Sequence, residues 1–364
     1  MIQSYDIGSL PFFGNLDTFV RGAESFKADV NDGCAVFFEK SVLKAFSDKL
    51  AVGIDIPNFP QFRDMNEMFL STLSGVKRLK KGFVETEKLR LKAGQGCLPE
   101  MLAIKKSADT LNERSKKPFT MKLCVTGPYT LASFFPYRTS EYFSRLGEVI
   151  SQIIDANIFS EKNCCVGFVS VDEPLFGLVD DPLIDPGSSG RENLLKAWNN
   201  IFSFARAKKA VTCLHLHSTS DELFWAVESL DVVESHVDDP LYQMSETKKR
   251  LESENKVLKA SVCVTDFDRL IRENLSASSP GLNGFTLDEA VAETWGKLRK
   301  NAIAPEVFVD TQDVMKRRAR QIIAKFGRER VPYFGPECGL RGFPTYESAL
   351  ECLRRIAYVR KSLA

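Results

Sequence analysis

The sequence predicts an α/β fold, a single (β/α)₈ TIM barrel with insertions in the βα loops, and three observations lead to it. Eight short apolar runs rich in β-branched residues alternate with longer segments of helical periodicity. The runs are continuously apolar, which is typical of parallel strands covered on both faces. The length of 364 residues fits one such barrel, so residues 1–364 are expected to form one domain. An open doubly wound sheet or two domains are the weaker alternatives.

The expected strands follow one another along the chain, each ahead of a segment long enough for a helix. They cover residues 4–9, 52–56, 119–126, 165–172, 210–217, 231–236, 257–264 and 331–338. Helical spacing of apolar residues predicts helices over 141–158 and 311–326, and Thr286 begins a capping box for a helix that runs to Arg299. The charged stretch 76–93 is also expected to be helical.

Composition and charge exclude several classes of protein. The 49 basic and 48 acidic residues give a net charge of +1, so no overall charge attracts nucleic acid or an anionic membrane surface. No apolar run is long enough to span a bilayer. Nine cysteines, an odd number, and a first segment without a signal-peptide pattern indicate a reducing compartment, and we expect the cytoplasm.

Polar side chains gather where the expected strands end, and the βα loops of such a sheet converge there to form the ligand site. These strand ends carry Gly8, Ser9, Asp55, Asp172, Glu173, His215, His217, Glu234 and Cys338. His215 and His217 are two apart on one strand, so both rings point to the same side and can reach one ion.

Glu234 and Cys338 supply a carboxylate and a thiolate from other strand ends, which completes a set that suits Zn²⁺ better than Mg²⁺ or Ca²⁺. A pair of histidines also occurs for purely structural reasons. The third histidine of the chain, His236, is expected to lie outside the ligand set, behind a ligand or at the surface.

Five motifs resemble, in the same order, the catalytic half of cobalamin-independent methionine synthase. They are Gly8-Ser9, VDEP at 171–174, His-x-His at 215–217, Glu234 and GPECGL at 335–340. The similarity is to the short, single-barrel members of that family and extends over nearly the whole chain. It implies a (β/α)₈ fold, a bound zinc ion and transfer of a methyl group to the zinc-bound thiolate of homocysteine.

The resemblance also assigns roles to individual residues. The metal ligands of the family fall on His215, His217, Glu234 and Cys338. Asp172 takes the position that holds the substrate amino group, and Gly8 with Ser9 takes the loop that holds its carboxylate. Asp172 and Glu173 together form an acid pair that is expected to face the pocket and to act in catalysis.

One departure from the family pattern concerns the metal. The first ligating cysteine of the family is replaced by His217, although Cys213, two residues before His215, is an alternative ligand. With His217 the centre is neutral, and with a second cysteinate it is anionic. The less anionic set acidifies a bound thiol more but leaves its sulfur less nucleophilic.

Two further departures concern the substrates. A second acid that contacts the amino group falls on Phe59, where Gln61 or Asp55 could compensate. The catalytic histidine of the family has no counterpart in residues 262–267, so a proton for a folate leaving group would come from Asp266. A methylcorrinoid donor needs no such proton.

The resulting expectation is a zinc-dependent thiol S-methyltransferase. Homocysteine is the expected acceptor and coenzyme M the alternative, while a methylcorrinoid, carried by a corrinoid protein, or a methyl-folate or pterin is the donor. A metal-free barrel hydrolase that uses Asp172 or Glu173 with Glu234 is the alternative from another class of enzyme. A barrel that binds a corrinoid without catalysis is a third.

Overall fold

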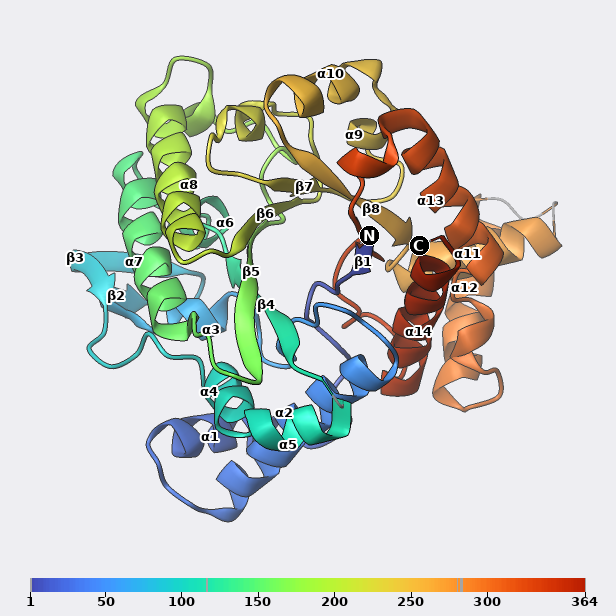
Figure 1. Cartoon of the computed structure of the whole chain (residues 1–364), viewed down its shortest axis with the longest axis horizontal. Helices are drawn as coiled ribbons and strands as arrows, with labels where there is room; N and C mark the ends of the chain where they lie inside the picture. The colour runs from blue at the N-terminus through green and yellow to red at the C-terminus, as the bar shows by residue number, and fades with distance from the viewer. Residues whose placement is uncertain (1, 116, 280, 282–283, 364) are drawn as a thin grey trace.

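The strands of this protein form a curled parallel sheet with helices outside it. The computed structural model describes residues 2–363 except 116, 280 and 282–283. Seven strands pair in the order β1-β9-β8-β7-β6-β5-β4, every neighbouring pair parallel. They are β1 (Gln3–Ser4), β4 (Phe119–Thr126), β5 (Cys164–Glu173), β6 (Val211–Leu216), β7 (Val232–Glu234), β8 (Val257–Cys263) and β9 (Tyr333–Pro336). Figure 1 shows the strands curving around the middle of the molecule. The α/β fold with a parallel sheet is therefore confirmed.

The strand expected at 52–56 does not form as a regular strand. Instead, Ile56 and Asn58 make isolated parallel bridges to Tyr5 and Lys122, so this segment lies between the two edges of the sheet. Pro57 and Pro60 flank Asn58, and prolines cannot donate the hydrogen bonds of a regular ladder. The described residues thus form a curled sheet of seven strands with an irregular connection between its edges, rather than eight regular strands.

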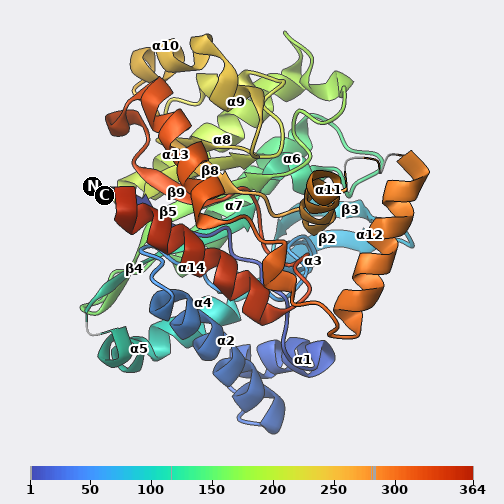
Figure 2. The same ribbon diagram turned by 90° about the vertical axis from the view of Figure 1, so that its right-hand side faces the viewer.

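The helices cover the outer side of this sheet, as Figures 1 and 2 show from two directions. The longer ones are α1 (Leu16–Lys27), α2 (Gly33–Ala51), α7 (Glu141–Asn157), α8 (Ser189–Ala207), α11 (Phe267–Ser278), α12 (Gly284–Arg299), α13 (Gln312–Phe326) and α14 (Tyr346–Leu363). The shorter ones are α3 (Glu67–Leu70), α4 (Pro99–Lys106), α5 (Ala108–Ser115), α6 (Pro128–Ala132), α9 (Pro240–Gln243) and α10 (Ser245–Ser253). The two helices expected from apolar periodicity are α7 and α13, with most of the periodic residues buried.

Two helix predictions need correction. The stretch 76–93 is not a helix but falls mostly in the antiparallel hairpin of β2 (Leu73–Arg78) and β3 (Phe83–Leu91). Gly82, with φ +85°, lies in the turn, and Phe83 and Leu89 are buried while the charged residues around them face outward. Two buried apolar residues thus attach a hairpin strand whose other side chains are exposed or partly buried, and the density of charge obscured this pattern. The helix expected to begin at Thr286 is already formed at Gly284, so its capping box does not mark the start.

Among the described residues, no helix combines the length and the apolar character needed to cross a membrane.

Candidate metal centre

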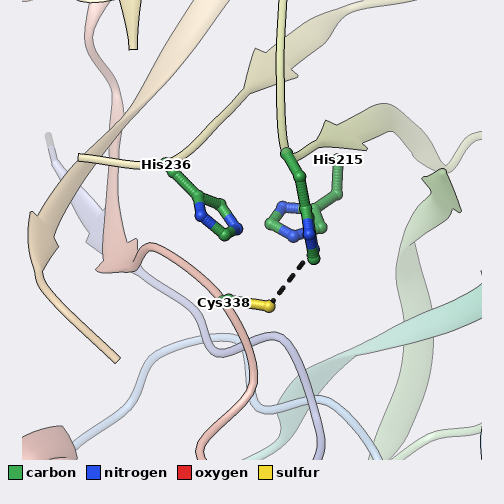
Figure 3. A group of neighbouring side chains, drawn as sticks. His215, His236 and Cys338 are labelled. Atoms are coloured by element: carbon green, nitrogen blue, oxygen red, sulfur yellow. Dashed lines mark hydrogen bonds between the residues drawn. The ribbon is translucent and has the colours of Figure 1, made fainter. Parts of the chain in front are cut away.

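Four side chains that can bind a metal meet at the carboxyl ends of three strands. His215 lies near the end of β6, His217 directly follows it, His236 follows β7 and Cys338 follows β9. One ligand atom from each lies within 4.8 Å of the others. Figure 3 shows the ring of His236 facing that of His215, and its dashed line marks the contact between the Cys338 thiol and the neighbouring ring of His217.

The rings and the thiol are in close contact. Cys338 Sγ lies 3.4 Å from Nε2 of His217, and the ring centroids of His217 and His236 are 4.2 Å apart. The centroid of the His215 ring is 5.4 Å from that of His217 and 6.0 Å from that of His236. The four groups therefore surround one small space from different strands.

Burial keeps the imidazoles of this group in the form that binds metal. It lowers the pKa of His215 to about 4, against the opposing effect of the Glu234 carboxylate. Burial also lowers the pKa of His217 to about 2, helped by the two other histidines. Burial raises the pKa of the Cys338 thiol to about 12, and the nearby Asp172 adds to this effect. Neutral imidazoles have a free lone pair, and a divalent cation at this position would deprotonate the thiol.

The site fits a metal ion by its polar atoms as well as by its geometry. Nε2 of His215 and Nε2 of His236 are buried without a hydrogen-bond partner. Each buried polar atom without a partner costs about 1–3 kcal/mol, so such a concentration of them is unusual unless something binds there. Three imidazole nitrogens and a thiolate are ligands for zinc, whereas magnesium and calcium require oxygen.

Glu234, expected as a ligand, is not part of this group of four. Its carboxylate is fully buried and accepts a hydrogen bond of 2.7 Å from the Tyr5 hydroxyl. It also pairs with Lys259 at 2.8 Å and lies 3.8 Å from Lys122. Burial alone would raise the pKa of Glu234, but the two ammonium groups outweigh it and hold the pKa well below its usual value.

The structure brings His217, and not Cys213, into the group of potential ligands. The Cys213 thiol is fully buried, 3.6 Å from the Tyr5 hydroxyl. Burial and the Glu234 charge raise the pKa of this thiol far above its ordinary value. Cys213 thus lies two residues deeper in β6, beside the ion pairs of Glu234.

Asp172 lies beside the cluster, and one of its carboxylate oxygens has no hydrogen-bond partner. It pairs in register with His215, and its Oδ1 is 3.6 Å from Nε2 of His215 with no hydrogen-bond partner. Burial raises the pKa of this carboxyl to about 8, although Lys122 acts in the opposite direction. An ammonium group or another cation would therefore find an unsatisfied acceptor here.

Gly8 and Ser9 lie next to the loop that carries the thiol. The main-chain carbonyl of Ser9 accepts a 2.9 Å hydrogen bond from Leu340, and its hydroxyl packs against Gly339. Gly8 has φ +134°, and a Cβ atom there would come within 2.1 Å of the Asn58 amide. Only glycine is accommodated at this position, which brings the 8–9 turn close to Cys338.

The remaining predicted site residues are engaged elsewhere. Asp55 accepts hydrogen bonds from the amide and hydroxyl of Ser4 and pairs with Arg360 of α14. Asp266 is exposed and caps α11 by accepting from the amide of Arg269 at 3.2 Å. These contacts tie secondary-structure elements together and give no argument for a role in the chemistry.

Glu173 is also held by structural contacts. Its carboxylate accepts from the amides of Tyr129 (3.0 Å) and Thr130 (2.7 Å) at the start of α6 and from the Trp198 indole (3.0 Å). Burial raises its pKa to about 7 in spite of these three donors. Glu234 is likewise held by buried contacts. Of the three carboxylates proposed for a metal-free hydrolase, only Asp172 is therefore free to act, and such an enzyme needs two.

Replacing Glu173 with alanine is expected to lower the free energy of unfolding by about 1–3 kcal/mol, because three buried N–H groups lose their acceptor. Urea denaturation of the variant measures this loss, and the content of bound metal should not change. Glu148→Ala on the exposed side of α7 is the control, with an expected effect within about 0.5 kcal/mol. Loss of metal at unchanged stability would instead place Glu173 in the chemistry.

The sequence interpretation missed three kinds of residue at this site. His236 was expected outside the ligand set, yet its ring joins the group. Lys122 and Lys259 are fully buried charges on strands that were taken as apolar. Glu337, part of the GPECGL motif but given no role from the sequence, accepts hydrogen bonds from the amides of Val237 and Thr265 and so holds the loops after β7, β8 and β9 together.

Neither the known family models nor the curated proteins contain a match to this chain. Solved structures do match it. A B12-independent methionine synthase from Shewanella sp. W3-18-1, in complex with selenomethionine, aligns with a TM-score of 0.59 at 12% identity, covering 100% of this chain and 98% of that chain.

Two more structures agree with this result. A candidate vitamin B12-independent methionine synthase from Listeria monocytogenes aligns with a TM-score of 0.57 at 13% identity, over 100% of this chain and 99% of that chain. A methyltransferase from Methanosarcina mazei aligns with a TM-score of 0.53 at 11% identity, over 100% and 94%. The chain therefore shares the fold of methionine synthase-like proteins along its whole length, and its resemblance to them extends from motifs to structure.

Proposed function

We propose that this protein is a zinc-dependent methyltransferase whose acceptor is a small thiol. The observation that carries the proposal is the group of three imidazoles and one thiol at the strand ends, in a fold shared with methionine synthase-like proteins. His215, His217 and Cys338 are the proposed ligands common to the sequence and the structure. The fourth position has two candidates, Glu234 from the sequence and His236 from the structure.

The residues around the site suit a thiol amino acid. A bound zinc ion would coordinate the acceptor thiol and lower its pKa toward neutrality. The unsatisfied Oδ1 of Asp172 is available to accept a hydrogen bond from a substrate ammonium group. Ser9, whose hydroxyl lies beside Gly339 in the loop of Cys338, would offer that hydroxyl to a substrate carboxylate.

Homocysteine is the acceptor we propose, with coenzyme M as the alternative. Phe59, at the position of a second acid in the resembled family, is fully buried, and the Gln61 amide donates to the carbonyl of Cys124. With Asp55 also engaged, Asp172 is the one predicted carboxylate left for an amino group. An acceptor that lacks this group, such as coenzyme M, would lose a single contact.

For the donor, we propose a methylcorrinoid, free or carried by a corrinoid protein. The departing Co(I) corrinoid needs no proton, whereas a methyl-folate or pterin would need an acid. The candidate acid for that task, Asp266, is exposed and caps a helix. The carboxyl beside the cluster, Asp172, is proposed to accept a hydrogen bond from the substrate ammonium group and is not assigned this proton.

The proposal is tested by metal content and methyl transfer. Protein purified without chelators is expected to contain about one zinc per chain and to methylate homocysteine from methylcobalamin. Coenzyme M and methyltetrahydrofolate serve as the alternative acceptor and donor. The proposal fails if carefully prepared protein holds no zinc, or if zinc-loaded protein methylates neither thiol with either donor.

A further inference from the structure

We infer that His236 is the fourth metal ligand and that Glu234 is a positioning residue, tied into a buried ion network beneath the centre. The inference rests on the proposed function only in that the cluster holds a divalent metal. It differs from the ligand set implied by the sequence resemblance, in which Glu234 is bound to the ion. Three sets of contacts support it.

The first is the engagement of the Glu234 carboxylate. Oε2 accepts from the Tyr5 hydroxyl at 2.7 Å and pairs with Lys259 at 2.8 Å, while Oε1, which has no hydrogen-bond partner, lies 3.8 Å from Lys122. Both lysines are 0% exposed. A metal bound at Oε1 would compete with two buried ammonium groups for this single negative charge, and poorly compensated buried charges are strongly unfavourable.

The second set of contacts joins the Glu234 carboxylate to the ring of His215. Oε1 of Glu234 lies 3.2 Å from Nδ1 of His215. A carboxylate at this nitrogen favours the tautomer in which Nδ1 carries the proton, which leaves Nε2 free to bind a metal. Glu234 therefore acts on the ion through the orientation of the His215 ring.

The third is the position of His236. Its Nε2 is buried and has no hydrogen-bond partner, and its ring lies 4.2 Å from that of His217 between centroids. The loop that carries it is fixed, because the amide of Val237 donates to Glu337, the neighbour of Cys338. One acid thus holds the His236 loop and the Cys338 loop at a set distance.

The assignment changes the charge of the centre. A divalent ion with one thiolate and three neutral imidazoles keeps one uncompensated positive charge, whereas a carboxylate in place of an imidazole makes the centre neutral. Since Lys122 and Lys259 already use the charge of Glu234, the site favours an incoming anion. The substrate class that fits this centre is a small thiol that binds as the thiolate. For the thiolate to bind, the metal must become five-coordinate or release one of its four protein ligands.

X-ray absorption of the zinc-loaded wild-type protein tests the inference without any substitution. Imidazole rings give outer-shell scattering that a carboxylate does not. We expect three rings and one sulfur around the ion. Two rings, one oxygen and one sulfur would overturn the inference but leave the proposed function standing. Absence of zinc would defeat both, and three rings without methyl transfer would defeat the proposed function alone.

Variants at the two residues give a second test, with zinc affinity and the visible spectrum of the Co²⁺-substituted protein as readouts. His236→Ala should remove one ring, change the cobalt spectrum and weaken zinc binding more than about 100-fold. That loss exceeds the one expected for a residue that only hydrogen-bonds to a metal ligand. Glu234→Gln keeps an oxygen for Nδ1 of His215 and should retain the spectrum. Glu234→Leu removes that oxygen and should weaken binding about 10–100-fold.

The pair of Glu234 variants separates the two roles. Both leave Lys122 and Lys259 without a counter-charge, so a general loss of stability affects them alike. A ligand role would remove the same oxygen from the metal in both variants. Equal loss of zinc from Glu234→Gln and Glu234→Leu, with His236→Ala unaffected, would therefore contradict the inference.

Discussion

Substitution of Cys338 by serine is expected to remove stoichiometric zinc and to abolish methyl transfer to homocysteine. Cys338 is the one thiol in the group of four, and a hydroxyl is a poor replacement for a thiolate on zinc. We expect zinc affinity to fall more than about 100-fold, since even the loss of a residue that hydrogen-bonds to a metal ligand lowers metal affinity about 10–100-fold. Elemental analysis after gel filtration and a methyl-transfer assay measure the two effects.

Cys213→Ser is the matched control for this prediction. Cys213 also comes from the sheet interior near the site, but its thiol contacts Tyr5 and is not part of the group. The control should keep about one zinc per chain and its activity. Retention of zinc by Cys338→Ser together with its loss from Cys213→Ser would exchange the roles of the two cysteines. Activity in a zinc-free Cys338→Ser protein would end the metal-dependent account.

Replacing Lys259 with methionine is expected to destabilise the fold by about 3–5 kcal/mol, the range for removing one partner of a buried ion pair. Lys259 is 0% exposed, pairs with Glu234 at 2.8 Å and donates to the carbonyl of Pro336 at 2.6 Å. The variant leaves Glu234 with Lys122 at 3.8 Å as its remaining cation. Chemical denaturation measures the change, and Lys249→Met, at an exposed lysine, should have little effect.

The double variant Lys259→Met/Glu234→Gln distinguishes lost charge compensation from lost packing. Removing both charges should recover part of the stability lost by Lys259→Met, because neither member of the Lys259–Glu234 pair is then buried alone, although Lys122 loses its counter-charge. Lys122 keeps the Tyr5 ring, 4.4 Å from its ammonium group, as a partner. Strictly additive destabilisation would show that the two residues do not interact and would contradict the buried network.

Most of the sheet follows from continuous apolar runs in the sequence. The expected strand at 119–126 coincides with β4, and those at 165–172 and 210–217 match β5 and β6 to within one residue at each end. The run at 52–56 shows the limit of this reasoning. Its apolar residues do lie beside the sheet, but Pro57 and Pro60 after it prevent a regular ladder.

The site was predictable in its location and in part of its membership. Strand ends place His215, His217 and Cys338 together because parallel strands end at the same edge. His236 stood at the end of the expected strand 231–236, but the resemblance assigned the ligand of that strand to Glu234, and His236 was expected outside the ligand set. In the structure β7 ends at Glu234, and His236 follows it in a loop where Asp238 has φ +70°. A signal for the engagement of Glu234 was present: the apolar runs at 119–126 and 257–264 each contain a lysine, and buried lysines need a carboxylate.

The order of the ligands along the chain has a consequence for how the protein acquires its metal. Cys338 follows β9, the strand that pairs with both β1 and β8, and so joins the opposite ends of the sequence. During synthesis the three histidines emerge about a hundred residues before the thiol does. The proposed centre is therefore complete only after β9 has inserted, and zinc uptake would be a late event that locks the last strand into place.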